Sequence, residues 1–153
     1  MELHDMIAEE RICLIEETQK KAALLQLIGR AVREGAVAEE DAAPLTEKIF
    51  YREALMSTGI GIGIAIPHVR FEKVRRQMIV IGIQPRGIPD YPSIDDQPVQ
   101  LVVLILMGKN QHREYVELLS AIVRVLKTDN VKQKLVDAPR PDAAWAVFRE
   151  ALS

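Results

Sequence analysis

The sequence of 153 residues has little of several residue types, and each shortage excludes a class of protein. Its single cysteine, Cys13, allows neither an intrachain disulfide nor a cysteine-based metal cluster, which fits a reducing compartment. No run approaches the roughly 18 uninterrupted apolar residues of a membrane span. The first residues also lack the basic segment and apolar core of a signal peptide. We therefore expect a cytoplasmic protein with no direct membrane insertion.

An excess of charge of one sign is also missing. Lys and Arg together number 20, Asp and Glu number 22, and the formal net charge is -2. A nucleic acid or an acidic membrane as partner would require a local basic patch that the composition does not show, so neither is expected. With 48% apolar residues the chain can bury one continuous core, and we expect residues 1–153 to form a single domain.

Sequence motifs for metals, nucleotides and serine hydrolysis do not occur. His4, His68 and His112 are far apart, without the spacing of metal ligands. Neither glycine-rich phosphate-binding pattern, G-x-G-x-x-G or G-x-x-x-x-G-K-[ST], is present, and there is no G-x-S-x-G nucleophile elbow. No metal or other cofactor is therefore expected.

Apolar residues recur at helical spacing near both ends of the chain. They predict helices over residues 19–34, 42–56, 113–127 and 141–152. Gly35 follows the first helix where a stop is expected, and the second can begin with Asp41 as N-cap and Pro44 in its first turn. The apolar stripe predicted for the third helix consists of Val116, Leu119, Ile122, Val123 and Leu126.

Short runs rich in β-branched residues lie between these helices. Residues 77–83 and 99–107 are bounded by turn residues and are typical of strands buried on both faces. The prolines between them predict an exposed, stiff loop over residues 85–98. Helices on both sides of buried strands indicate a layered α/β domain.

The most unusual stretch is residues 57–71, STGIGIGIAIPHVRF. As one strand it would alternate a face of small residues, open to close packing, with a face of isoleucines. Pro67 lacks an N–H group and has a fixed φ, so it should end the strand and turn the imidazole of His68 toward solvent. A histidine in this place can be a nucleophile, a general base, a metal ligand or a core residue.

Residues 52–68, REALMSTGIGIGIAIPH, resemble the signature segment of the fructose/mannitol-type (type 2) enzyme IIA domains of the bacterial phosphoenolpyruvate-dependent sugar phosphotransferase system. Members of that family carry an Arg-Glu pair, a Ser-Thr-Gly, a glycine-rich strand and an Ala-hydrophobic-Pro-His ending. The resemblance covers nearly the whole chain and includes the nitrogen-related regulatory branch. It implies an α/β fold in which a central mixed β-sheet is flanked by helices on both faces.

The resemblance implies that His68 accepts a phosphoryl group from the phosphocarrier protein HPr and passes it to an enzyme IIB domain. Such a transfer needs in-line positioning and donors for the phosphoryl oxygens, and no metal or nucleotide. In the regulatory branch, the phosphorylation state of His68 would instead govern binding to a regulatory target protein. A domain that no longer accepts phosphate is a third reading.

Three further residues are implied to support His68. Arg52 matches the arginine of the family pattern, and its guanidinium offers a planar fork to phosphoryl oxygens; the alternative is a surface ion pair with Glu53. Thr58 can donate its hydroxyl or cap a turn. Tyr115 stands where many members have a second histidine, and it can donate its hydroxyl or pack as a half-buried aromatic.

The basic cluster after His68 contains Arg70, Arg75 and Arg76, which we interpret either as a docking patch for the partner or as a solvated edge. The sequence also departs from the family pattern close to the histidine. Ile62 stands where a polar residue, commonly Asn, is usual, and Val69 stands where glycine is frequent. His112 is expected to be exposed to solvent.

Overall fold

The computed structural model of the chain describes residues 3–152. The helices are α1 (Leu3–Met6), α2 (Lys20–Arg33), α3 (Ala42–Leu55), α4 (His112–Leu126), α5 (Val131–Asp137) and α6 (Pro141–Leu152). The strands are β1 (Ile12–Leu14), β2 (Gly59–Gly61), β3 (Ile64–Ala65), β4 (His68–Arg70), β5 (Met78–Ile88) and β6 (Val99–Met107). Single 3-10 turns lie at Glu9–Arg11 and Glu39–Asp41.

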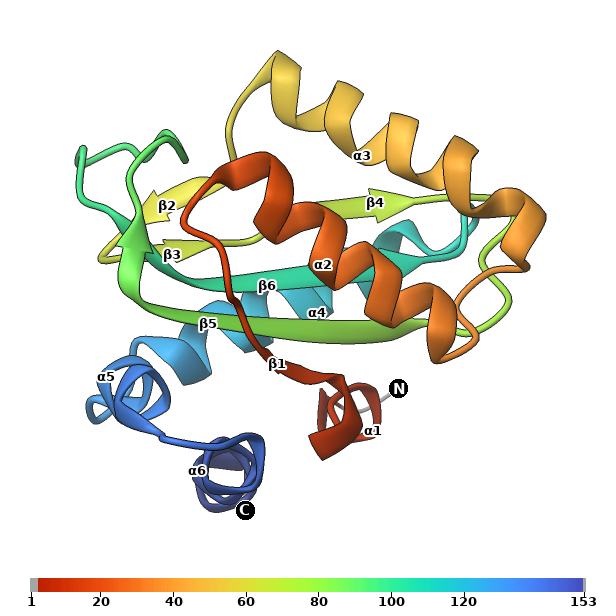
Figure 1. Ribbon diagram of the computed structural model, residues 1–153. Helices are drawn as coiled ribbons and strands as arrows, with labels where there is room; N and C mark the ends of the chain where they lie inside the picture. The colour runs from red at the N-terminus through yellow and green to blue at the C-terminus, as the bar shows by residue number, and fades with distance from the viewer. Residues whose placement is uncertain (1–2, 153) are drawn as a thin grey trace.

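The strands form one mixed sheet in the order β1-β5-β6-β3-β2, in which β4 also pairs with β6. The long antiparallel pair β5 and β6 is its centre; β1 runs parallel to β5, and β3 and β4 run parallel to β6. Helices α2 and α3 cover one face, while α1, α4, α5 and α6 lie on the other (Figure 1). The predicted α/β fold, a central mixed sheet between helices, is confirmed.

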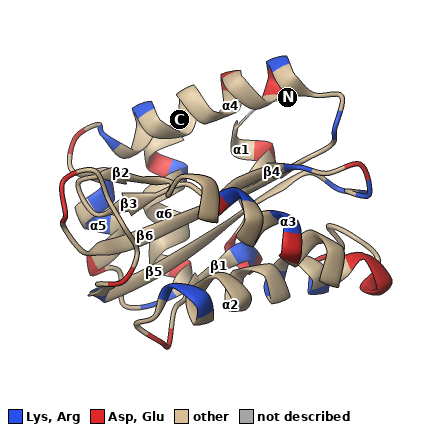
Figure 2. Cartoon of the chain, turned by 90° about the horizontal axis from the view of Figure 1, so that it is seen from above, with Lys and Arg blue, Asp and Glu red and all other residues tan. Residues whose placement is uncertain are grey.

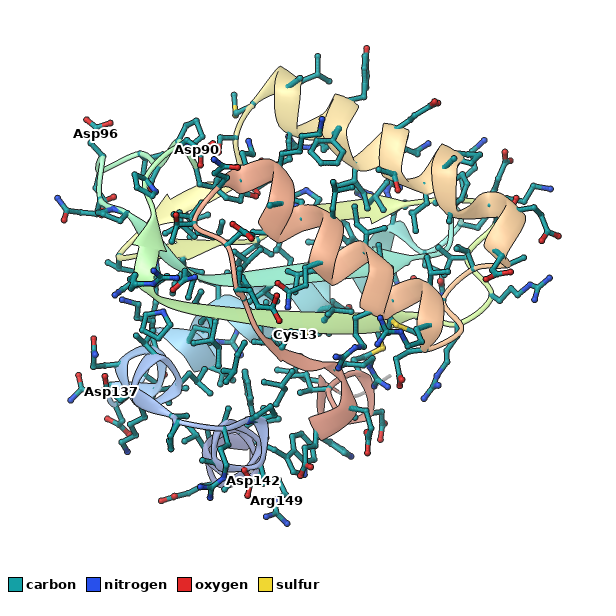
Figure 3. All side chains as sticks on the ribbon, in the orientation of Figure 1. Cys13, Asp90, Asp96, Asp137, Asp142 and Arg149 are labelled. Atoms are coloured by element: carbon teal, nitrogen blue, oxygen red, sulfur yellow. The ribbon has the colours of Figure 1, made fainter. Side chains whose placement is uncertain are left out.

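Two hydrophobic clusters fill the space between the sheet and its two helical layers. Successive residues of β5 alternate between them: Val80 belongs to the cluster beneath α2 and α3, and Ile81 to the cluster beneath α4, α5 and α6. Figure 3 shows side chains in both layers. The two central strands are therefore buried on both faces, as their uninterrupted apolar runs predict.

Each predicted helix is present, but two details of their sequence-based description are wrong. Asp41 precedes α3 without a capping hydrogen bond from its side chain, because the 3-10 turn leads directly into the helix. In α4 the buried residues are Tyr115, Leu118, Ile122 and Leu126, while Val116 is 46% exposed. The buried stripe is turned toward Tyr115, which packs beside His68. Strand β1 and helices α1 and α5 were not predicted.

The glycine-rich stretch is a hairpin, so the prediction of one strand with two distinct faces is wrong. β2 and β3 pair antiparallel, and the chain reverses at Gly61, Ile62 and Gly63, whose φ angles are 95°, 53° and 78°. Glycine adopts positive φ without steric cost, which lets the chain turn back instead of continuing. Close packing against a small residue does occur at Gly59, where an added Cβ would collide with the carbonyl oxygen of Pro92.

The proline-rich segment is less exposed than predicted. β5 continues to Ile88, with a shift of its pairing to β6 between Ile83 and Ile88. That irregularity accommodates Pro85, which cannot donate a ladder hydrogen bond. Ile88 and Tyr91 are both buried, so the prediction of an exposed loop is wrong for these residues.

Candidate functional site

His68 opens β4, whose strand partner is β6. Pro67 separates β3 from β4, and its carbonyl accepts a hydrogen bond of 2.9 Å from the Ile105 N–H. Alternation along β4 buries Val69 in the cluster beneath α2 and α3 and places His68 against Tyr115 of α4. The imidazole is thus half-buried beside α4 instead of turning freely into solvent.

An open groove of about 640 Å³ surrounds the imidazole. Its walls come from α3, β4, the turn after β6 and the start of α4. The lining residues are Lys48, Tyr51, Arg52, Leu55, His68, Val69, Arg70, Lys109, Asn110 and Tyr115. Four of them share one face of α3, because they recur at i, i+3, i+4 and i+7.

One hydrogen bond defines the tautomer of His68. Its Nδ1 lies 2.7 Å from the carbonyl oxygen of Ile66. A carbonyl oxygen only accepts hydrogen bonds, so Nδ1 carries the proton and Nε2 keeps its lone pair in the neutral ring. Burial lowers the pKa of His68, and the charges of Arg52 and Arg70 lower it further, against the opposing effects of the Ile66 hydrogen bond and Glu53. The ring is therefore neutral at neutral pH, with a nucleophilic Nε2.

The groove is rich in positive charge. Lys48, Arg52, Arg70 and Lys109 line it, and no carboxylate does. None of the ion pairs found among residues 3–152 involves these four side chains. A cluster of three acidic residues, Glu39–Asp41, precedes α3 and so lies at the opposite end of that helix from Arg52 (Figure 2). Cations without carboxylate partners around a nucleophile suit an anionic substrate.

Arg52 and Tyr115, two of the predicted supporting residues, both line the groove with His68. The Nη1 of Arg52 donates a hydrogen bond of 2.7 Å to the Met56 carbonyl, and the alternative ion pair with Glu53 is not formed. Tyr115 is 8% exposed, and its ring is also 5.9 Å from the guanidinium carbon of Arg70. Burial raises the pKa of Tyr115, so its hydroxyl stays protonated and can donate a hydrogen bond.

Thr58 and two of the three arginines of the basic cluster are not part of the groove. The Thr58 hydroxyl is 2.5 Å from the Glu53 carboxylate and 3.0 Å from the Tyr91 hydroxyl, in a buried network. The backbone N–H groups of Arg75 and Arg76 bond to the Ala36 carbonyl. Of that cluster only Arg70 lines the groove, and the interpretation of Arg70, Arg75 and Arg76 as a docking patch stays a prediction.

Several residues of the groove were not identified from the sequence. Lys48, Tyr51 and Leu55 lie on the same helical face as Arg52, so their spacing from Arg52 could have identified them in the sequence. Lys109 and Asn110 lie in the turn after β6, where no local pattern marks them. His112, at the start of α4, is exposed as expected.

Neither a metal site nor a membrane-spanning helix is found over residues 3–152. No cluster of three or more His, Cys, Asp or Glu residues in this range could hold a metal ion. No helix within the same range has the length and apolar character needed to cross a membrane.

Comparison with known proteins relates the chain to one family. Residues 5–151 match the family model described as "Phosphoenolpyruvate-dependent sugar phosphotransferase system, EIIA 2". The chain is 31% identical over 133 residues to the PTS system fructose-specific EIIA component of Haloferax volcanii, covering 87% of this chain and 84% of that protein. It is 30% identical over 149 residues to the nitrogen regulatory protein homolog of Haemophilus influenzae, covering 97% and 91%. The crystal structure of the nitrogen regulatory protein IIA-Ntr from Neisseria meningitidis superimposes with a TM-score of 0.83 at 25% identity, covering 94% of this chain and 97% of that one.

Proposed function

The chain belongs to the EIIA type 2 family of the phosphoenolpyruvate-dependent sugar phosphotransferase system, and we propose that it carries a phosphoryl group on Nε2 of His68. The group comes from phosphorylated HPr and goes to an enzyme IIB domain. The proposed carrier is a single domain that works in the cytoplasm. The observation that carries the proposal is the hydrogen bond from Nδ1 of His68 to Ile66, which leaves Nε2 as the nucleophile in a cationic groove.

The chemistry requires one bond to form as another breaks. The lone pair of Nε2 attacks the phosphorus of the donor phosphohistidine, the new N–P bond forms, and the electron pair of the breaking bond returns to the donor imidazole. Nδ1 of His68 keeps its proton throughout and donates it in the hydrogen bond to the Ile66 carbonyl, so the ring keeps one orientation. The second transfer, to an enzyme IIB nucleophile, runs the same step in the opposite direction.

The groove supplies charge for the transferred group. Arg52 and Arg70 flank His68, and their guanidinium groups suit the three phosphoryl oxygens. Tyr115 adds a hydroxyl donor beside them. In a half-buried site such preorganised donors stabilise charge on the transferred group more strongly than water does, and they need no metal ion.

The test is phosphorylation in a reconstituted relay. The protein is incubated with phosphoenolpyruvate, enzyme I and HPr, and its intact mass and the acid lability of any added phosphate are measured. We expect one acid-labile phosphoryl group on the wild type and none on His68→Ala. A wild type without label, or a labelled His68→Ala, would contradict the proposal.

A regulatory role is the second candidate, since the chain is 30% identical to a nitrogen regulatory protein homolog over 97% of its length. In that role His68 is phosphorylated in the same way, but the phosphorylation state controls binding to a target protein. Adding an enzyme IIB of the same organism to the labelled protein distinguishes the two. Rapid loss of label to enzyme IIB supports the carrier, and retention supports the regulator.

A further inference from the structure

Glu53 is a buried carboxylate directly after Arg52 on α3, and it is only 4% exposed. Its Oε1 lies 3.0 Å from the Nζ of Lys20 at the start of α2. The backbone N–H of Lys20 is in turn bonded to the Asp90 carboxylate at 2.7 Å, and Asp90 lies beside the start of α2 (Figure 3). A buried charged group is costly unless it is paired and hydrogen-bonded, so the contact with Lys20 stabilises the Glu53 carboxylate in one position.

The same carboxylate holds the segment that joins α3 to β2. Thr58 donates its hydroxyl to Oε2 at 2.5 Å and its N–H to Oε1 at 3.4 Å. The Tyr91 hydroxyl lies 3.0 Å from the Thr58 hydroxyl, and the Lys20 ammonium lies 4.5 Å from the centroid of the Tyr91 ring. Residue 58 is therefore held by Glu53 of α3 and by Tyr91 after β5, and Lys20 of α2 contacts both of these residues.

Arg52 is attached to this joining segment from its other side. Its Nη1 donates to the Met56 carbonyl at 2.7 Å, and its own carbonyl accepts the Met56 N–H at 3.5 Å. Met56 and Thr58 are separated by one residue, so a shift of Thr58 would move the carbonyl to which the guanidinium is bonded. Glu53 itself does not line the groove.

We propose that Glu53 is a positioning residue for phosphotransfer: through Thr58 it fixes residues 56–58, and through the Met56 carbonyl it aims the Arg52 guanidinium at the phosphoryl group. This inference rests on the proposed function. Small displacements of a positioned group reduce transfer strongly, since a shift of about 1 Å can cost roughly a hundredfold in rate.

A double-mutant cycle tests the inference. The rate of His68 phosphorylation by phosphorylated HPr is measured for wild type, Glu53→Gln, Arg52→Ala and the double variant. We expect Glu53→Gln to reduce kcat by roughly 10- to 100-fold with little change in the KM for HPr, because Glu53 is buried. In the Arg52→Ala background the same change should have almost no effect, since there is no guanidinium left to position.

The outcomes separate this inference from the proposed function. If the wild type acquires no phosphoryl label from HPr, the proposed function is overturned and this inference with it. A labelled wild type with an unchanged Glu53→Gln rate overturns the inference alone. An equal loss in both backgrounds also overturns it, because the carboxylate would then act independently of Arg52.

A second pair of variants covers the case in which Glu53→Gln does not fold. Thr58→Val breaks the same chain of contacts without leaving Lys20 unpaired, and it should slow transfer only when Arg52 is present. Thr46→Val is the matched control. It removes a hydroxyl on the same helix that is bonded to the Ala42 carbonyl at 2.8 Å and has no link to residues 56–58. Equal rates for the two valine variants would overturn the inference.

Discussion

The rings of His68 and Tyr115 lie with their centroids 5.1 Å apart and their planes tilted by 43°. This contact joins β4 at the edge of the sheet to the first turn of α4. It restricts the imidazole from one side while the Ile66 carbonyl holds Nδ1, so Nε2 has little freedom to turn away from the groove. Tyr115 thus has both a packing role and, through its hydroxyl, a chemical one.

Tyr115→Phe separates these two roles. It keeps the ring contact and removes the hydroxyl, so we expect the melting temperature to change little. The rate of His68 phosphorylation should fall about 3- to 10-fold, which corresponds to the free energy that one ordinary hydrogen bond contributes. Stopped-flow or quenched labelling with phosphorylated HPr measures the rate, and a rate equal to that of the wild type would assign Tyr115 to packing alone.

The lowered pKa of His68 predicts the pH dependence of the reaction. Burial disfavours the imidazolium, so the neutral nucleophile should persist below the ordinary value of 6.5. We expect the acid limb of the pH profile for phosphorylation to lie below pH 6.5. NMR titration of the His68 ring measures the pKa directly, and a value above 6.5 would contradict the prediction.

The same shift has a consequence for stability. In the unfolded chain the imidazole of His68 has its ordinary pKa of 6.5, which is higher than its pKa in the folded protein. As the pH falls from 6.5 toward the folded pKa, the unfolded chain therefore binds the proton first, and the free energy of unfolding falls. Urea titrations should therefore show that the free energy of unfolding decreases more between about pH 7.5 and about pH 5.5 for the wild type than for His68→Gln. Equal losses would show that His68 does not contribute to the pH dependence.

Arg52→Lys tests the planar fork of the guanidinium. Lysine keeps the positive charge but cannot contact two phosphoryl oxygens in one plane, so we expect phosphorylation to slow by about tenfold. The control is Arg33→Lys, at an exposed position of α2 outside the groove, which should leave the rate unchanged. If both variants react like the wild type, Arg52 acts only as a charge.

The positive φ of Ile62 predicts that replacing this residue with Asn stabilises the protein. Ile62 is a β-branched residue with a φ of 53° at the tip of the β2–β3 turn, and its side chain is 49% exposed. Asn adopts this region with less strain, so Ile62→Asn should raise the free energy of unfolding by about 1 kcal/mol. Phosphorylation should not change, because Ile62 does not line the groove.

Ile94→Asn is the control for that substitution. Ile94 is 83% exposed and is not among the residues with positive φ, so its replacement should change the unfolding free energy by less than about 0.5 kcal/mol. Equal effects of the two variants in urea titrations would show that loss of surface hydrophobicity, and not backbone strain, is the cause.

The sequence by itself determined the elements that rest on local periodicity. Helices α2, α3, α4 and α6 and the buried cores of β5 and β6 follow from apolar spacing over neighbouring residues. The family resemblance, which extends beyond residues 52–68, also identified the family and singled out His68, Arg52 and Tyr115. These predictions needed no knowledge of which distant segments meet.

Only the tertiary structure decided the features that depend on contacts between distant segments. Periodicity does not report the positive φ angles that fold the glycine stretch into a hairpin. Whether Thr58 faces the groove or Glu53 depends on where α2 and Tyr91 pack, and the cation at Lys109 reaches the site only because β4 pairs with β6. Burial and hydrogen bonding between remote residues set these choices, because an ionised or polar group that leaves water must find its partner wherever the fold brings one.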